Sequence, residues 1–392
     1  MYRYLLLGLC FFGAQAFAQT QFAAVLDGAQ EVPSGPLDPT RLGIGDITLN
    51  VAETEISVRL NWVGLSATPD MAHIHGPADP GVNGPVIFPL APLQGATTGG
   101  VGPLVFTVTP SQVAELKARK WYFNVHTPAL PSGEIRGQLV PKQLTFSATP
   151  RGALETIQNF SQGRGYARLE SDLETGATSI STSFRNLGSN VTAVHIHGPG
   201  APGVNAPVLF TLGPITPASN SGEFTNFFNL SILQGAQLAE GLFYVNIHST
   251  EFPGGELRGQ LLPGTPVRAV LSGSQEVPPV ITPAKGEGFF WTNYIGTRVF
   301  GVIDFQDLPT NLTGSHIHTA PVGANGSVIV NFPSPPLGSR GTQQNLAAPL
   351  PISEVQRAGL ATGAHYFNFH TSQNPSGEIR GQIDGSFGSG FE

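Results

Sequence analysis

The chain has 392 residues, of which 40% are hydrophobic and only 11% are charged, and its formal net charge is −7. This acidic balance excludes the basic face that binds nucleic acid, so we expect no nucleic-acid partner. The 49 glycines and 34 prolines, combined with regular apolar alternation, favour many short strands joined by turns.

The first 18 residues are predicted to be a secretory signal peptide. Arg3 is followed by an apolar run over residues 5–12 and by a small-x-small cleavage pattern, AFA, at residues 16–18. The apolar run is too short to cross a bilayer and no later stretch is long enough, so we expect no transmembrane segment. The only cysteine, Cys10, lies in this segment. We therefore expect a secreted chain, periplasmic or extracellular, that is held by packing without disulfides.

The remaining chain repeats one unit three times. The block HIHGP begins at His73 and at His195, and the related HIHTA begins at His316, so the period is 122 and then 121 residues. A second block, ending in GEIRGQ or GELRGQ, recurs with a similar period. Because this period is the length of a whole domain, we predict domains at 19–141, 142–264 and 265–384. A flexible Gly/Ser-rich tail is expected at 385–392.

The first elements that we predict in the unit are two strands between residues 47 and 62. Apolar and polar residues alternate in both, which is the pattern of an antiparallel hairpin with one buried side. The residues expected to face the core are Ile47, Leu49, Val51, Ile56, Val58, Leu60 and Trp62, and those expected to face away are Ser57, Arg59 and Asn61.

The next element that the sequence indicates is a short helix over residues 109–119. Thr109 is its predicted N-cap, and Pro110 occupies the first helical position. The helix leads into another strand, WYFNVHT. Repeated short strands with frequent turns predict an all-β fold, with three tandem Greek-key β-sandwich domains that each carry one short helix.

Nine of the ten histidines fall at equivalent positions of the three units. Residues two apart on a strand point to the same side, so His73 and His75 share one face, while Ile74 points to the core. His126 follows on a later strand, where Val125 points to the core. Three imidazoles that meet and leave a fourth position open suit a copper or zinc ion. The predicted metal ligands are His73, His75, His126, His195, His197, His248, His316, His318 and His370.

The alternative is that each histidine is structural and bridges strands through a backbone carbonyl. In that case the loss of one histidine costs an ordinary buried hydrogen bond, about 1 kcal/mol. A metal site differs because added metal stabilises the fold by mass action. The sequence leaves both interpretations open.

The SGEIRGQ block holds the second set of candidate residues. Glu134 and Arg136 share a strand face, and one interpretation is an exposed ion pair that closes a sheet edge and stabilises it by less than about 1 kcal/mol. In the other, Glu134 accepts a hydrogen bond from a ligand histidine, and Arg136 draws an anion toward the metal. Asn124, on the strand face of His126, is a further candidate for supporting a ligand. The full set is Asn124, Glu134, Arg136, Asn246, Glu256, Arg258, Asn368, Glu378 and Arg380.

These blocks resemble the CHRD domain, which is named after chordin. The resemblance rests on HIHGPADPGVNGPVIF at residues 73–88 and YFNVHTPALPSGEIRGQL at residues 122–139, and it covers nearly all of the chain after residue 18 as three copies. The second copy departs at its head, where FSATPRGALET replaces the LDGAQEVP of the first copy. The resemblance implies an extracellular β-sandwich of the immunoglobulin-like or superoxide-dismutase-like type, and it implies no particular molecular function.

The order of the site residues also resembles copper/zinc superoxide dismutase, a family of Greek-key β-barrels. That family binds copper through an H-x-H pair and a later histidine, and an arginine in a Gly-rich segment guides the anion. The resemblance implies copper ligation by His73, His75 and His126 and anion guidance by Arg136. The chain lacks the bridging histidine, the zinc-ligand cluster and the cysteine pair of that family, so the resemblance implies a mononuclear copper or zinc site.

We therefore expect a secreted binding protein with a three-histidine metal site in each domain. Its expected partner is an extracellular protein or surface component, because linked modules gain avidity and suit a binding array. Two alternatives stay open. One is a copper-dependent, dismutase-like redox enzyme, and the other is an adhesion or structural protein whose histidines brace the sheets.

Overall fold

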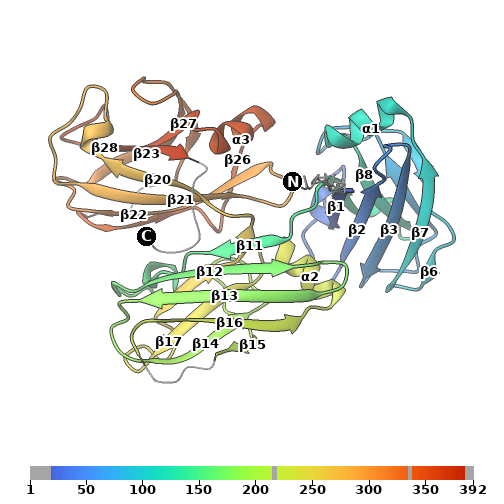
Figure 1. Ribbon diagram of the computed structural model, residues 1–392, viewed down its shortest axis with the longest axis horizontal. Coiled ribbons are helices and arrows are strands. Elements are labelled where there is room, and N and C mark those ends of the chain that lie inside the picture. The colour runs from blue at the N-terminus through green and yellow to red at the C-terminus, as the bar shows by residue number, and fades with distance from the viewer. Residues whose placement is uncertain (1–18, 214–218, 334–337, 385–392) are drawn as a thin grey trace, which may run out of the picture.

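The computed structural model describes residues 19–213, 219–333 and 338–384. The predicted signal peptide, 1–18, and the predicted tail, 385–392, lie outside the described residues. Figure 1 shows three units built from antiparallel sheets, which we call module 1 (residues 20–141), module 2 (145–263) and module 3 (267–384). The predicted all-β fold in three domains is confirmed. No helix in the described ranges is both long and apolar enough to cross a membrane.

Module 1 is a sandwich of a six-stranded and a four-stranded antiparallel sheet. The larger sheet has the order β10-β1-β2-β3-β7-β6, and the smaller sheet has the order β5-β4-β8-β9. The strands of the larger sheet are β1 (Thr20–Leu26), β2 (Leu42–Leu49), β3 (Glu55–Val63), β6 (Gln94–Gly95), β7 (Gly99–Thr107) and β10 (Val140–Pro141). Those of the smaller sheet are β4 (Met71–His75), β5 (Val86–Pro89), β8 (Tyr122–Thr127) and β9 (Leu130–Gln138).

Module 2 repeats this arrangement with a five-stranded and a four-stranded sheet. Their orders are β16-β13-β12-β11-β19 and β15-β14-β17-β18. The larger sheet contains β11 (Thr145–Ala148), β12 (Arg164–Ser171), β13 (Ala177–Arg185), β16 (Gly222–Asn229) and β19 (Leu262–Pro263). The smaller sheet contains β14 (Val191–His197), β15 (Val208–Leu212), β17 (Tyr244–Ser249) and β18 (Leu257–Gln260).

Module 3 joins the two layers into one nine-stranded sheet. Its path is β24-β23-β27-β28-β20-β21-β22-β25, and β26 pairs with β22. The layers connect where β20 pairs with β28. At the equivalent place in modules 1 and 2, the two layers are joined only by an isolated bridge. The strands are β20 (Val267–Ser272), β21 (Lys285–Thr292), β22 (Arg298–Gln306), β23 (Leu312–Thr319), β24 (Ser327–Asn331), β25 (Gly341–Gln344), β26 (Leu350–Pro351), β27 (His365–Thr371) and β28 (Ile379–Asp384).

Within the described residues, each module has one short α-helix and one 3-10 turn. The helices are α1 (Pro110–Lys117), α2 (Ile232–Ala239) and α3 (Glu354–Ala361), and the 3-10 turns are η1 (Gly28–Gln30), η2 (Gly152–Leu154) and η3 (Gly273–Gln275). In α1, Thr109 is the N-cap as predicted, and Gln112 completes a reciprocal capping box. The helix ends at Lys117, two residues before the predicted end.

The predicted hairpin is formed by β2 and β3, with one error at its turn. Ile47, Leu49 and the four predicted residues of β3 are all buried. Val51, however, is 57% exposed, so its predicted place in the core is wrong. Strand β2 ends at Leu49, and the side-chain oxygen of Asn50 accepts hydrogen bonds from the backbone N–H groups of residues 54 and 55. This turn interrupts the alternation that the sequence pattern assumed.

The smaller sheet of module 1 is apolar on one face and carries the histidines on the other. Ile74 of β4 and Val125 of β8 are fully buried, and they belong to the same core cluster as Trp62 of β3. The core therefore lies between the two sheets, and the candidate site lies on the outer face of the smaller sheet.

The modules also pack against one another. Helix α2 of module 2 lies against β2 of module 1, and Gln237 donates a hydrogen bond to the carbonyl oxygen of Pro39 at 2.7 Å. Between modules 2 and 3, the Trp291 indole N–H donates to Ser147 Oγ at 2.8 Å, in a buried position. Contacts of this kind, in addition to the short joints, hold the three modules together.

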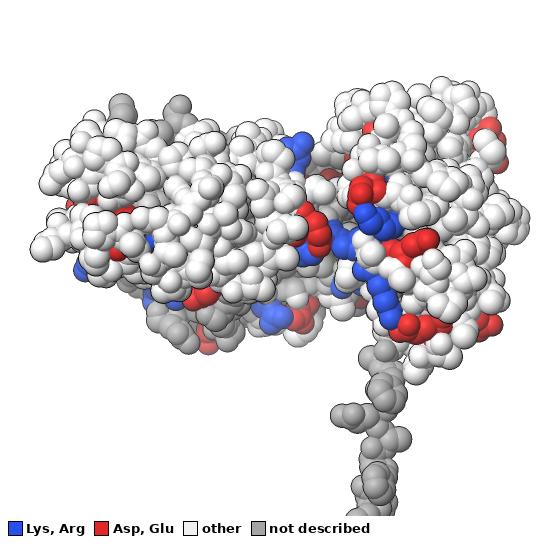
Figure 2. Space-filling view, turned by 90° about the horizontal axis from the view of Figure 1, so that it is seen from above, with Lys and Arg blue, Asp and Glu red and all other residues white. Residues whose placement is uncertain are grey.

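Charged side chains gather where module 1 meets the rest of the molecule. Figure 2 shows positive and negative groups side by side along this junction, while most of the surface in that view is uncharged. Arg119 of module 1 pairs with Glu354 of module 3 at 2.9 Å, and Arg357 donates to the same carboxylate at 3.0 Å. The few charges of this chain thus contribute to contacts between modules.

Candidate metal centre

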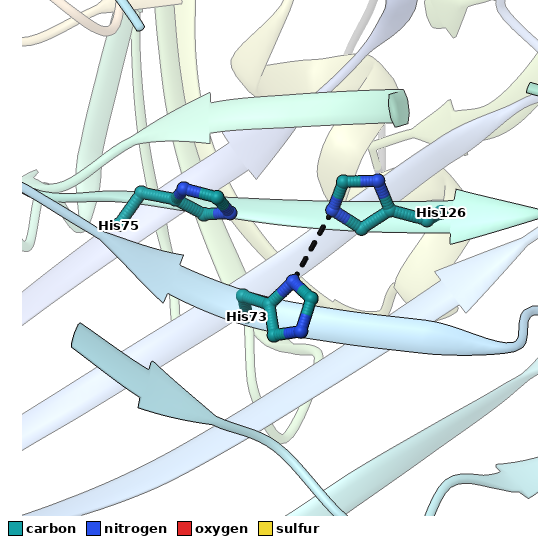
Figure 3. Close-up of side chains that lie close together, drawn as sticks. All are labelled: His73, His75 and His126. Carbon is teal, nitrogen blue, oxygen red and sulfur yellow. Dashed lines mark hydrogen bonds between the residues drawn. The ribbon is translucent and has the colours of Figure 1, made fainter. Parts of the chain in front are cut away.

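Three histidines meet on the outer face of the smaller sheet of module 1. Strand alternation buries Ala72 and turns His73 and His75 away from the core, and β8, the antiparallel neighbour of β4, supplies His126. In Figure 3 the three rings face a common point, two from one strand and one from the next.

The same arrangement recurs in all three modules. In each, one ring nitrogen from each of three histidines lies within 4.8 Å of the other two. The groups are His73, His75 and His126; His195, His197 and His248; and His316, His318 and His370. The predicted convergence therefore occurs, and each of these groups could hold a metal ion.

Two of the three rings in each module are held by backbone carbonyl groups. His75 Nδ1 lies 3.0 Å from the oxygen of Gly84, and His126 Nδ1 lies 3.0 Å from the oxygen of Pro131. A carbonyl can only accept, so Nδ1 carries the hydrogen of the neutral ring and Nε2 presents its lone pair. The equivalent pairs are His197–Ala206, His248–Pro253, His318–Gly326 and His370–Pro375, at 2.8 to 3.0 Å.

The nitrogens that face the common point have few protein partners. His73 Nδ1 lies 3.3 Å from His126 Nε2, and the equivalent distance in module 2 is 3.2 Å. Several of the others are buried without a hydrogen-bond partner among the described residues, namely His75 Nε2, His197 Nε2, His318 Nε2, His316 Nδ1 and His370 Nε2. A buried acceptor without a partner is costly. In each module, a cation at the common point would satisfy the three ring nitrogens that face it.

Burial lowers the pKa of several of these histidines and so favours the neutral ring, which is the form that binds metal. Burial lowers the pKa of His73, and the neighbouring His126 and His75 lower it further. Burial is also the largest cause that lowers the pKa of His75. The charges of His126 and Arg136 lower this pKa further, while the hydrogen bond to Gly84 raises it. In module 3, burial and the two other histidines lower the pKa of His316 to about 4. At neutral pH, metal binding therefore displaces no proton from His73, His75 or His316.

A tyrosine that sequence reasoning missed supports the site in each module. Tyr122 stacks on His75, with ring centroids 4.9 Å apart and planes 11° apart, and its hydroxyl accepts a hydrogen bond from the N–H of Gly84. The same stack joins His197 to Tyr244 and His318 to Tyr366. The signal was present in the sequence, because the tyrosine recurs in all three YFNVHT-like blocks on the strand face of the histidine.

Arg136 lies behind this tyrosine, buried, and its contacts are to the tyrosine ring and to a loop. Its guanidinium carbon is 3.5 Å from the centroid of the Tyr122 ring, and the residue is only 1% exposed. The two ends of the guanidinium donate to Asn83 Oδ1 at 3.1 Å and to the oxygen of Val82 at 2.8 Å. Arg258 and Arg380 make the same stack. Because the guanidinium N–H groups donate to the β4–β5 loop, this arginine shapes the loop that holds His75.

Glu134 is buried, and its described partners differ from those that either interpretation assigned to it. It accepts hydrogen bonds from Ser66 N at 2.6 Å, Ser66 Oγ at 2.8 Å and Thr127 Oγ1 at 2.6 Å, and it pairs with Arg41 at 3.1 Å. In the part of the chain that the structure describes, it forms no hydrogen bond with a histidine and no ion pair with Arg136. Glu256 and Glu378 likewise bind loop residues. These carboxylates brace the loops around the site.

Asn124 contacts a glutamate instead of a histidine. Its amide donates to Glu31 Oε2 at 3.4 Å, and Asn368 donates to Glu276 in the same way. In module 2, a Cβ at Gly255 would lie 2.6 Å from Asn246 Oδ1 and 2.6 Å from Glu155 Oε1, so these two side chains lie side by side at this glycine. The predicted support of a ligand by these asparagines is therefore not found among the described contacts. Glycine is required here because a Cβ at Gly133 would lie 2.5 Å from Asn124 Oδ1.

The glutamate beside this asparagine has an unusual pKa. Burial raises the pKa of Glu31, Glu155 and Glu276 to about 7, from an ordinary value of 4.5. Sequence reasoning missed these residues, although QEVP recurs in the heads of modules 1 and 3.

Replacing these three glutamates with glutamine should change how stability depends on pH. A raised pKa means that the folded chain keeps a proton that the unfolded chain has lost, so ionisation lowers the stability of the wild type as the pH rises from about 4.5 through about 7. The E31Q/E155Q/E276Q variant lacks this loss. Urea unfolding at a series of pH values should show its stability, relative to wild type, rising across this range. A difference that stays constant with pH would contradict the assignment.

Comparison with known proteins gives one result that covers most of the chain. A family model for the CHRD domain matches residues 22–139, 146–261 and 267–383. No curated protein matches the chain.

Proposed function

Since the chain belongs to the CHRD family and carries three CHRD domains in tandem, we propose that it is a secreted binding protein that holds a copper or zinc ion at a three-histidine site in each domain. The observation that carries this proposal is the orientation of the rings. In each module, two histidines donate Nδ1–H to a backbone carbonyl, so the lone pair of Nε2 is the one that can act as a ligand.

The donor set favours copper or zinc over other ions. Neutral imidazole is a good ligand for both, whereas magnesium and calcium prefer oxygen donors. Three protein ligands leave a fourth position for water or for a group from a partner. The tandem arrangement adds avidity if the partner is an extracellular protein or surface component that presents several such groups.

The test is the metal content of the full chain, purified without a histidine tag. Mass spectrometry should find about three equivalents of copper or zinc per chain after loading and dialysis, one for each group of histidines. The variants His75→Ala, His197→Ala and His318→Ala should each lose one equivalent. His365→Gln is the matched control, because His365 contacts the oxygen of Gln356 and belongs to none of the groups. Metal that stays bound in the combined His→Ala variant would overturn the proposal.

One observation favours a second candidate, a copper-dependent redox activity of the dismutase type. The three histidines of module 2 are only partly buried, so an ion bound there keeps a side open to small molecules from the solvent. The test compares superoxide removal by the copper-loaded chain with that by the same concentration of free copper. A rate no greater than that of free copper removes this candidate and leaves the binding function.

A further inference from the structure

The face of β4 that carries the two histidines of module 1 also carries a methionine. Met71, His73 and His75 alternate with the buried residues Ala72 and Ile74, so all three side chains leave the same side of the strand. Met71 is 43% exposed, which is unusual for so apolar a side chain. Its position beside the three rings therefore needs an explanation.

Strand pairing brings this methionine next to the third histidine. In the antiparallel register of β4 and β8, Met71 lies directly opposite His126. Side chains at such positions are neighbours, with Cβ atoms about 4.5–5.5 Å apart. His126 Nε2 in turn lies 3.3 Å from His73 Nδ1. The unbranched side chain of methionine has three rotatable bonds, so its sulfur can reach toward the point that these two nitrogens face.

The methionine distinguishes module 1 from the other two modules. The chain has two methionines, Met1 and Met71, so the only one within the described residues stands at a histidine cluster. The residue opposite the third histidine is Ala193 in module 2 and Gly314 in module 3. Neither of these residues has a side-chain atom that can bind a metal.

A thioether is a soft donor with a narrow preference. Soft sulfur ligands select copper(I), whereas imidazole suits zinc and copper(II) as well. We propose that Met71 supplies a fourth, thioether ligand at the histidine cluster of module 1 and makes this site selective for copper(I). This inference rests on the proposed function, because it assigns the metal preference of one of the three sites.

The experiment uses the full chain with one intact site at a time. The variant H197A/H318A keeps the site of module 1, and the variant H75A/H318A keeps the site of module 2. Copper(I) affinity is measured under ascorbate by competition with a chromophoric copper(I) chelator, and zinc affinity by competition with a zinc chelator. In the chain that keeps the site of module 1 (site 1), Met71→Leu should weaken copper(I) binding on the order of tenfold or more and leave zinc binding nearly unchanged.

Two further measurements make the result specific to sulfur. X-ray absorption of the copper(I) form should show a sulfur neighbour in the chain that keeps site 1, and this neighbour should disappear with Met71→Leu. Ala193→Met, placed in the chain that keeps site 2, should strengthen copper(I) binding there. Leucine is a suitable replacement because position 71 is 43% exposed and leucine is also apolar and similar in size, so little effect on folding is expected.

The outcomes separate this inference from the proposed function. If zinc and copper bind but Met71→Leu leaves the copper(I) affinity and the absorption spectrum unchanged, the role of Met71 is refuted and the three-histidine sites stand. If no form of the chain binds either metal, the proposed function itself fails, and the inference fails with it.

Discussion

Zinc at a free concentration of 100 times its dissociation constant should raise the unfolding free energy of each module by about 2.7 kcal/mol. For a domain of this size, that corresponds to a rise in unfolding temperature on the order of 10 °C. The physical reason is that the three ring nitrogens converge only in the folded sheet, so the ion binds the folded state in preference to the unfolded chain. Differential scanning calorimetry of the full chain, with and without zinc, measures the effect.

The control variants decide where the zinc acts. In H75A/H197A/H318A the rise should disappear, because each module then keeps only two ligands. In His365→Gln it should persist, because this ring lies outside the three groups. An equal rise in the triple variant would mean that zinc stabilises the chain from another place, and the structural interpretation of the histidines would then be favoured.

Replacing Arg136 should weaken the metal site of module 1 without removing any ligand. Arg136→Met removes the stack on Tyr122 and both hydrogen bonds to the β4–β5 loop, and Gly84 of that loop holds the Nδ1–H of His75. We expect zinc affinity at this site to fall about 10- to 100-fold, as is usual when the group that orients a ligand is lost. The module should also lose about 3 kcal/mol of stability, since a buried cation–π contact and charged hydrogen bonds disappear.

Two comparisons test this role of Arg136. Arg136→Lys keeps the charge, but it lacks the planar fork, so it should restore little of the zinc affinity. Arg168→Met removes an exposed arginine that pairs with Glu170 at 2.8 Å, and it should change stability by less than about 1 kcal/mol. Zinc titration is done well below the unfolding temperature of each variant. An unchanged affinity in Arg136→Met would show that the loop holds His75 without the arginine.

The roles of the buried charged residues could not be predicted from the sequence. Glu134 and Arg136 were expected to act on each other or on the site because they share a strand face. Their actual partners, Ser66 and Asn83, come from loops 68 and 53 residues away in the chain. Neither loop has a periodic pattern that predicts where its polar atoms point. One of the two interpretations placed both side chains at the surface, since the loops that cover this face of the sheet could not be foreseen.

Local rules succeeded where only the neighbouring residues matter. The alternation of β4 placed His73 and His75 on one face, because side-chain direction in a strand follows from the backbone alone. Thr109 was identified as a cap because a cap acts within one helical turn. Val51 shows the limit of such rules, since the turn at Asn50 ends the strand before the apolar pattern ends.

The sequence by itself determined the β class, the threefold repeat and the set of nine histidines, because these depend on periodicity and composition. Only the tertiary structure decided that the three rings of each set meet, because the antiparallel register between β4 and β8 places His126 beside His73 rather than elsewhere along the strand. The tertiary structure also decided which nitrogen of His75 and of His126 can bind a metal. That choice depends on the carbonyl groups of Gly84 and Pro131, which lie in loops whose course follows from packing and not from any local pattern.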